Sequence, residues 1–444
     1  MELLVIGAFC LELIVCVALG LPVLVPLAIG LVIFLWYGKA KGHGARDLAL
    51  MTARGVSTAK GVLESFALIG ILTALWRACG TISQIVVMTS GLITPSFVPV
   101  ACFLLCGLVS YLMGTSFGTG ATMGVVCGTI GNACGGNPYL LGGAVLAGCY
   151  FGDRCSPVSS SALLVRSLTN TKMPDNLKAM MRTAAVPLVA SLVFYTVAGV
   201  ATAAGAAQAQ TGVAQMLTAY YGNHLLALVP AAIIFALPLM GLGMKRCMAA
   251  TSVAAALVCL FLQGATPADL ARWAVFGFTA ADAGVNQLMS GGGLLSMVNV
   301  SLVVCLSSAY SGIFEGTGLL TGVQGHVSAV AEKFGPYAAV LAVSIPASMI
   351  ACNQTLAIVL TRQLCGPAEE SDAAMAIDLE NAPVVISPLV PWSIACTTIL
   401  TLAQAPAGSE IFAVYLWLIV VYQAFCRSKK FFQNSACNLG ATPI

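Results

Sequence analysis

The chain has 444 residues, of which 59% are hydrophobic and 8% charged, and its formal net charge is +3. A soluble domain carries about 25% charged residues, which it needs to cover its surface with polar groups. The composition therefore excludes an ordinary soluble protein and indicates one that lies in a lipid bilayer. The small net charge gives no reason to expect a nucleic-acid partner.

Apolar runs of spanning length recur along the whole chain. They are continuous rather than alternating, which favours helices over a barrel in lipid. At roughly 20 residues per crossing, the composition allows at most about 13 spans. The N-terminus lacks a basic segment and a small-residue cleavage site, so we expect the first run to be a retained span. The runs lie at about 3–19, 22–37, 61–80, 96–113, 117–133, 139–152, 184–206, 222–243, 247–263, 291–313, 337–352, 386–404 and 409–426, with a shorter one at 354–361.

The fold class expected from these runs is an all-α polytopic membrane protein. We expect about 11–14 transmembrane helices, including broken or re-entrant segments. The 17 cysteines form no Cys-x-x-Cys pair and there are only three histidines, so neither a disulfide framework nor a metal site is expected. The cysteines are interpreted as small apolar packing residues. No cofactor is expected beyond transported ions.

Lysine and arginine cluster after the second, sixth, eighth and last runs. One topology places all four clusters in the cytoplasm together with both termini, as positively charged cytoplasmic loops require. The stretches at 81–95 and 204–221 carry no charge and are expected outside. We therefore expect a multi-pass protein of the bacterial cytoplasmic (inner) membrane. The basic clusters are Lys39 to Lys60, Arg166 to Arg182, Lys245 with Arg246, and Arg427 to Lys430.

The two halves of the chain share weak sequence features. Ser156-Pro157 and Ser387-Pro388 each stand at the mouth of an apolar segment, and Phe117-Gly118-Thr119 has a rough counterpart in Asn353-Gln354-Thr355. The charge argument gives the halves opposite orientations, which predicts two inverted repeats. The predicted segments are 1–60 with two spans and a basic loop, 61–183 as the first repeat, 184–290 as connecting spans, 291–426 as the second repeat and 427–444 as a cytoplasmic tail.

A polar interruption at Gly152-Asp153-Arg154-Cys155-Ser156-Pro157 is the strongest candidate site. Pro157 lacks a backbone N–H and disfavours helix at Ser156, so we expect a helix break there. Unwound carbonyls suit a cation, and the start of the following half-helix suits an anion. The alternative is a cytoplasmic helix end where Asp153 and Arg154 are paired. The candidate ligands are Asp153, Arg154, Ser156, Ser159 and Ser160.

Two further interruptions supply candidate ligands. Thr115, Ser116 and Thr119 lie in a run of small residues, which is also typical of close helix packing. Asn353, Gln354 and Thr355 follow Pro346, and amides inside an apolar segment are costly unless they bind something. Ser387 beside Pro388 completes the set of binding candidates, and Pro157, Pro346 and Pro388 are the expected helix breakers.

Carboxyl groups near apolar runs are candidates for carrying protons. Glu315 lies late in the run at 291–313 among several glycines, and a partly desolvated carboxylate binds a proton more readily. Asp153 is the other candidate within a break. Glu64 is a weaker one, because it lies early in its run, where water reaches it.

These motifs resemble the signature of the NhaC-type Na+/H+ antiporters of the ion-transporter superfamily. The resemblance rests on residues 148–159, 114–119, 354–360 and 387–392, in the same order along the chain. It implies an inverted-repeat fold with broken helices and exchange of sodium for protons, and some relatives exchange organic anions. Asp153 and Glu380 match acidic positions of the family, which adds Glu380 to the proton-coupling candidates. Ser160 and Asn353 depart from it, because relatives often carry aspartates there.

The leading hypothesis is a secondary active transporter that exchanges Na+ for protons by alternating access. The alternative is a proton- or sodium-coupled antiporter or symporter of a small organic anion or amino acid, with Arg154 and the serines holding a carboxylate. An enzyme is not expected, because no catalytic motif occurs, and a passive channel would not need the broken segments. The expected partners are the lipid bilayer and a small ion or organic anion; the oligomeric state stays open, a homodimer included.

Overall fold

The computed structural model describes residues 2–19, 21–22, 24–90, 95–133, 136–202, 209–240, 242–319, 324–366 and 371–439. All regular elements in these ranges are helical, apart from an isolated bridge between Phe278 and Gly291. The expected all-α class is therefore confirmed. The elements are α1 (Glu2–Ala18), α2 (Leu24–Ala40), α3 (Ala45–Thr58), α4 (Lys60–Ala78), α5 (Thr81–Ser90), η1 (Pro95–Phe97), α6 (Val98–Met113), α7 (Ser116–Thr119), η2 (Gly120–Gly124), α8 (Val125–Ala133), α9 (Pro138–Cys155), α10 (Ser160–Thr169), α11 (Met173–Thr202), α12 (Ala209–Tyr221), η3 (Leu225–Leu228), α13 (Val229–Leu239), α14 (Met244–Leu262), α15 (Pro267–Phe276), α16 (Ala283–Met289), η4 (Leu294–Met297), α17 (Val298–Thr317), α18 (Gln324–Phe334), α19 (Pro336–Ala351), α20 (Gln354–Cys365), α21 (Asp372–Asn381), α22 (Pro383–Ile386), η7 (Ser387–Leu389), α23 (Ile394–Leu402), η8 (Ser409–Phe412) and α24 (Val414–Leu439).

The predicted apolar runs coincide with helices of the structure. Within the described residues, four helical stretches are long and apolar enough to cross a membrane, namely Lys60–Ala78, Met173–Thr202, Lys245–Leu262 and Leu294–Phe314. Two further pairs of helices pass the same test together but are bent, by 100° between α12 and α13 and by 56° before α23. Shorter apolar helices such as α6 and α19 complete a multi-pass membrane protein.

The outer face of α11 shows how the helices meet lipid. Val186, Val189, Val193 and Val197 recur every three or four residues on this helix and are all largely exposed. In water such a stripe would be unfavourable, whereas in a bilayer it faces acyl chains.

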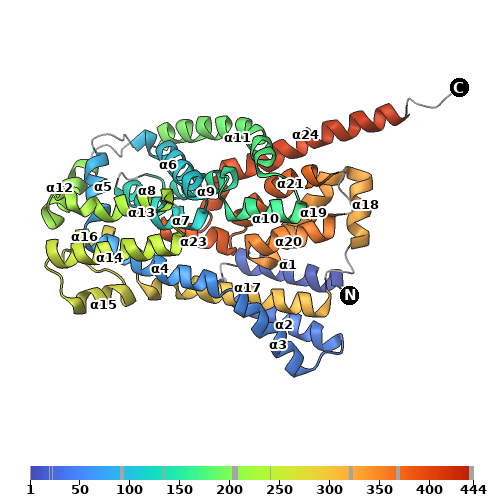
Figure 1. Ribbon diagram of the computed structural model, residues 1–444, viewed down its shortest axis with the longest axis horizontal. Helices are drawn as coiled ribbons and strands as arrows, with labels where there is room; N and C mark the ends of the chain where they lie inside the picture. Colours follow the sequence, from blue (N-terminus) through green and yellow to red (C-terminus); the bar gives the residue numbers. More distant parts are fainter. Residues whose placement is uncertain are drawn as a thin grey trace.

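The elements that carry the chain ends lie at the same end of the molecule. In Figure 1, α1 begins and α24 ends on the right, whereas α12, α15 and α16 lie on the left. A shared side for both ends agrees with the predicted topology. Which side faces the cytoplasm, the inverted relation of the two halves and the five predicted segments stay predictions.

Close packing of α9 on α6 fixes the position of the candidate site. A Cβ atom at Gly148 would lie 2.5 Å from the Phe103 carbonyl oxygen, and one at Gly152 would lie 2.2 Å from that of Gly107. Glycine spacing of this kind lets two helix backbones approach each other in lipid. Asp153 directly follows Gly152, so this packing fixes where its backbone lies relative to α6.

Two sequence expectations are wrong at the level of elements. Pro346 does not break its helix, because α19 continues through it to Ala351; neighbouring groups in a helical bundle can compensate for the missing N–H. The stretch predicted as an outside loop at 81–95 contains α5, whose residues Ile82 to Gln84 are buried. The absence of charge there reflects packing against α12 rather than a loop.

Candidate functional site

The predicted break between α9 and α10 is present and has a defined backbone. Ser156 ends α9 in an extended conformation, and Ser159 is the N-cap of α10. The Ser159 backbone N–H donates to the Ser156 carbonyl at 3.3 Å, which closes a turn around Pro157. The break expected from Pro157 is thus confirmed.

Asp153 is the centre of a buried hydrogen-bond network at this break. Its side chain is 3% exposed, and Oδ1 accepts from the Ser159 hydroxyl at 2.7 Å. The hydroxyls of Ser159 and Ser161 lie 2.8 Å apart. Ser116 of α7 is buried and interacts with the same carboxyl group. Two interruptions that lie about 40 residues apart in the sequence therefore meet at one carboxylate.

Ser160 does not share this network. It is the first residue of α10 and is exposed, whereas Ser159 and Ser161 on either side are buried. The sequence run of serines could not indicate which hydroxyls face Asp153, because that depends on the direction in which α10 leaves the break. Ser161 belongs to the same run of serines but was not among the candidate ligands, whereas the candidate Ser160 lies apart from the network.

Arg154 is fully buried but points away from Asp153. Its Nε donates to the Glu380 carbonyl at 3.3 Å and its Nη1 to the Met180 carbonyl at 3.1 Å. Its Nη2 donates to the Thr183 hydroxyl at 2.8 Å and to the Asn381 amide oxygen. Every nitrogen of the guanidinium thus has a protein acceptor on another helix. The alternative in which Asp153 and Arg154 form a pair is wrong for this structure.

Glu380 is a fully buried carboxylate near the end of α21. Within the part of the chain that the structure describes, neither of its carboxyl oxygens has a hydrogen-bond partner, and its charge interacts with those of Arg154 and Asp153. Asp378 on the same helix is also fully buried but accepts from Arg427 at 2.6 Å and from Gln423 at 2.7 Å. Glu380 therefore stands out as a carboxylate that the protein buries without satisfying it.

The second half repeats the break with a register that differs from the predicted one. Val390 is extended at φ −81° and ψ 115°, and Ser393 caps α23 at φ −67° and ψ 143°. Ser156 and Ser159 have nearly the same angles, −84° and 133°, and −63° and 137°. Both turns are closed by the same hydrogen bond, 2.9 Å long in the second half.

This match assigns the equivalences between the two breaks. Pro391 rather than Pro388 corresponds to Pro157, because Pro388 lies within the short helix η7 before the break. Ser387 then corresponds to Asp153, because each lies three residues before the extended residue of its break, Val390 and Ser156 respectively. The predicted pairing of the two Ser-Pro dipeptides is thus shifted by three residues.

The other two interruptions also match in backbone conformation. Gly114 ends α6 at φ +63° and Thr115 caps α7 in an extended conformation. Cys352 ends α19 at φ +50° and Asn353 caps α20 in the same way, its side chain accepting from the Thr355 N–H at 2.9 Å. The amide of Asn353 therefore has a capping role.

The remaining candidates are held by their own elements. The Gln354 amide donates to the Val384 carbonyl at 2.9 Å. The Thr119 hydroxyl donates to the Thr115 backbone carbonyl at 2.9 Å. Ser387 donates to the Pro383 carbonyl at 2.8 Å and lies 3.1 Å from the Ser348 hydroxyl. Thr355 is exposed. The side chain of Glu315, in α17, lies outside the part of the chain that the structure describes.

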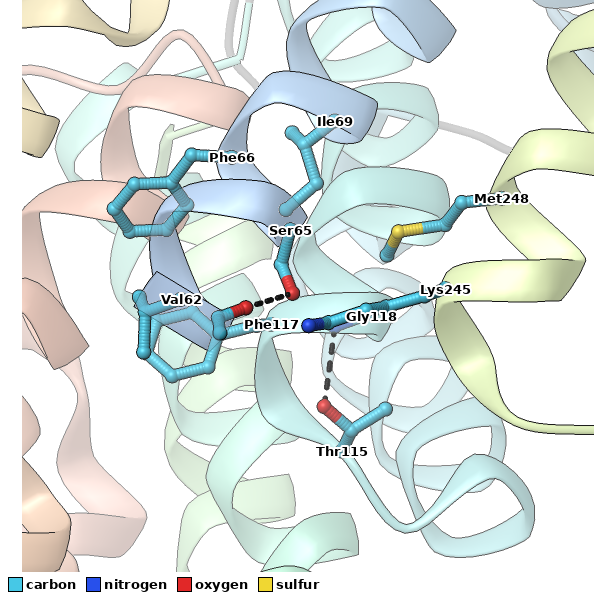
Figure 2. Close-up of a pocket in the computed structure, with 10 residues that line it drawn as sticks. Val62, Ser65, Phe66, Ile69, Thr115, Phe117, Gly118, Lys245 and Met248 are labelled. Carbon is cyan, nitrogen blue, oxygen red and sulfur yellow. Dashed lines mark hydrogen bonds between the residues drawn. The ribbon is translucent and has the colours of Figure 1, made fainter. Parts of the chain in front are cut away.

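A cavity of about 140 Å³ reaches the far side of α7. Thr115 and Phe117 form its wall, while Ser116 between them is buried and interacts with Asp153. Figure 2 shows Lys245 extending from α14 toward this wall, opposite Phe66 of α4. The single turn α7 and the π-helical turn η2 after it therefore separate the cavity from the buried network. Such π-helical turns are frequent at functional sites.

The sequence matches the Na+/H+ antiporter family over residues 65–163 and 148–425. The chain belongs to the Na+/H+ antiporter family. Its relatives include the Na+/H+ antiporter NhaC of Alkalihalophilus pseudofirmus, 24% identical over 82% of this chain and 81% of the relative. The arginine/ornithine antiporter ArcD of Halobacterium salinarum is 28% identical over 75% and 71% of the two chains. The malate-2H+/Na+-lactate antiporter of Bacillus subtilis is 26% identical over 88% and 86%.

Membership of the Na+/H+ antiporter family confirms the resemblance seen in the motifs. It places the chain among multi-pass membrane transporters, in agreement with its apolar helices. The matched residues include both helix breaks, Asp153 and Glu380. The relatives differ in what their names say they exchange, so the substrate has to be argued from this chain's own residues.

Proposed function

We propose that this chain exchanges Na+ for protons across the bacterial cytoplasmic membrane by alternating access. Asp153 binds the cation, and Glu380 carries a second titratable charge. The observation that carries the proposal is that two buried carboxylates lie within electrostatic range of each other, and that among the described residues only Asp153 has a hydrogen-bond partner.

Two carboxylates in one low-dielectric region cannot both remain ionised without compensation. A bound proton or a bound cation neutralises the excess negative charge of the two carboxylates. Sodium and protons therefore compete for the same groups. If the site opens to each side of the membrane only when it is neutralised, this competition is sufficient for exchange.

The ligands around Asp153 suit a hard cation. Carboxylate and hydroxyl oxygens are hard donors of the kind that hard cations prefer. Ser159 donates to Asp153, Ser161 is hydrogen-bonded to Ser159, and Ser116 interacts with the same carboxyl group. The extended backbone at Ser156 adds a carbonyl next to the break. A single formal charge with several neutral oxygens favours a monovalent ion over a divalent one.

Exchange of an organic anion or amino acid is the second candidate, and the names of two relatives favour it. In that case Arg154 would have to hold the substrate carboxylate. All its guanidinium nitrogens already donate to protein acceptors, so binding there would require α11 and α21 to release it. This geometry puts cation exchange ahead.

Transport by the purified protein in liposomes tests the proposal. An imposed sodium gradient should drive proton movement in the wild-type protein, and Asp153→Asn should abolish it while the protein stays folded. The double change Asp153→Asn with Arg154→Gln should not restore exchange, because the two side chains are not paired. Recovery in the double variant, or sodium-driven proton movement in Asp153→Asn, would contradict the assignment of Asp153.

A further inference from the structure

Arg77 is a second buried arginine, and it has no counter-ion among the residues that the structure describes. It lies in the last turn of α4 with 3% of its surface exposed. Its Nη1 donates to the Ser290 carbonyl at 3.3 Å. With the Gln404 amide oriented so that its oxygen faces Arg77, this oxygen accepts from both Nη atoms at 3.1 Å. Nε has no acceptor, and the ion pairs within the described residues do not include Arg77.

Tyr221 places a second unused donor beside this arginine. It interacts electrostatically with Arg77, is 5% exposed, and its hydroxyl has no hydrogen-bond partner among the described residues. A buried hydroxyl without a partner costs free energy, as does a buried charge without one. The Tyr221 ring also packs against Gly80, three residues after Arg77, where a Cβ atom would lie 3.0 Å from it. Both donors lack an acceptor within the described part of the chain.

The three residues that interact with Arg77 each lie where a helix ends. Tyr221 ends α12 where the chain bends by 100° into α13. Ser290 precedes Gly291, Gly292 and Gly293, all at positive φ, and Gln404 is itself at φ +53° after α23. In a membrane protein, irregular backbone is tolerated where it is buried in protein or lines a polar cavity. These irregular segments lie beside the buried guanidinium of Arg77, which is an arrangement expected of a ligand site.

Arg154 shows that this chain can satisfy a buried arginine completely. Its Nε, Nη1 and Nη2 all find protein acceptors, and it interacts with Glu380. Arg77 has neutral acceptors on one edge of its guanidinium only. The free Nε edge is the one that pairs with a carboxylate in the side-on geometry of arginine.

We propose that Arg77 and Tyr221 bind the carboxylate of a small organic monoanion. One charge on the ligand balances one charge on Arg77, whereas a dianion would leave a negative charge buried. Nε and the Tyr221 hydroxyl donate to the two carboxylate oxygens. The site is separate from Asp153 and Glu380, so it does not depend on sodium–proton exchange.

Tyr221→Phe is the decisive variant, because it removes only a hydroxyl that has no partner in the protein. If no anion binds, the change is neutral or stabilising. If a carboxylate binds, its affinity falls by about tenfold. The matched control is Tyr195→Phe, whose hydroxyl donates to the Phe412 carbonyl at 2.8 Å and lies away from Arg77. It should lower thermal stability without changing anion affinity.

The measurement is the rise in unfolding temperature of the purified protein in sodium-free buffer as acetate, lactate, malate or chloride is added. We expect a saturable rise with acetate and lactate, a weaker one in Arg77→Lys and none in Arg77→Gln. A rise with chloride but no carboxylate would overturn the assignment of the ligand. The absence of any rise in the wild-type protein, or an unchanged lactate affinity in Tyr221→Phe, would overturn the site itself. Asp153→Asn should keep the anion response, so failure of sodium–proton exchange and failure of this site can be told apart.

Discussion

At the scale of single residues, the few buried charges fall into two kinds. Arg154 and Asp378 have strong partners on other helices and connect those helices. Glu380 and Arg77 have a charge or a donor that the described protein leaves unsatisfied. Buried charges with partners stabilise the packing of the helices, and buried charges without partners indicate where an ion or a ligand binds.

Glu380 and Asp378 allow a matched test, since both are buried acids on α21. Glu380→Gln replaces an unpartnered carboxylate by a neutral group of the same shape. We expect unchanged or higher thermal stability and a transport rate that loses most of its dependence on pH. Reconstituted transport between about pH 6 and 9 and thermal unfolding measure the two effects.

Asp378→Asn is the control. It removes the charge that accepts from Arg427 and Gln423, and hydrogen bonds to charged groups contribute about 1.5–3 kcal/mol each. We expect a clear loss of stability, with pH-dependent transport kept by the folded fraction. If Glu380→Gln were the destabilising change and kept its pH profile, the roles assigned to these two acids would be reversed.

At the scale of elements, the site depends on where helices stop. Gly114 and Cys352 occupy equivalent left-handed positions, yet only one of them is a glycine. A Cβ atom at Gly114 would lie 2.7 Å from the backbone of Val158 in the opposing break. The two breaks of the first half therefore cross with backbone in contact, and a side chain at Gly114 would separate them.

Gly114→Ala should consequently impair both folding and transport. A non-glycine residue in this conformation costs about 1–2 kcal/mol, to which the displacement of Val158 adds. Cys352→Gly should be tolerated, because it relaxes the backbone while removing only a small side chain. Unfolding temperature and sodium-driven proton movement measure both variants, with Cys352→Ala to separate loss of the thiol from backbone freedom. Equal damage from Gly114→Ala and Cys352→Gly would show that the close crossing at Val158 is not what fixes the site.

At the scale of the whole molecule, the arrangement of ends and loops makes a topology testable. Arg46 and Asp175 are exposed, and we expect both in the cytoplasm with the chain termini. Arg272 is exposed on α15, a helix that lies at the opposite end of the molecule in Figure 1. We expect it outside.

Single cysteines at these positions in a cysteine-free background can be labelled with a membrane-impermeant reagent in intact cells. Arg272→Cys should react directly, and Arg46→Cys and Asp175→Cys only after the membrane is opened. Labelling of Asp175→Cys from outside would contradict the charge-based topology and with it the inverted orientation of the halves.

The sequence by itself determined the class of this protein, most of its helices and the first break. These depend on local properties, namely long apolar runs and a proline without an N–H group, and they need no knowledge of what packs against them. It also identified Asp153 and, through the family motif, Glu380.

Only the tertiary structure decided which side chains face one another. It separated Ser159 and Ser161 from the exposed Ser160, and directed Arg154 away from Asp153. It shifted the second break from Pro388 to Pro391, and left Glu380 and Arg77 unsatisfied. The physical reason is the same in each case: a side chain's direction and its partners follow from the angles at which helices leave a break and cross, which no local pattern of residues encodes.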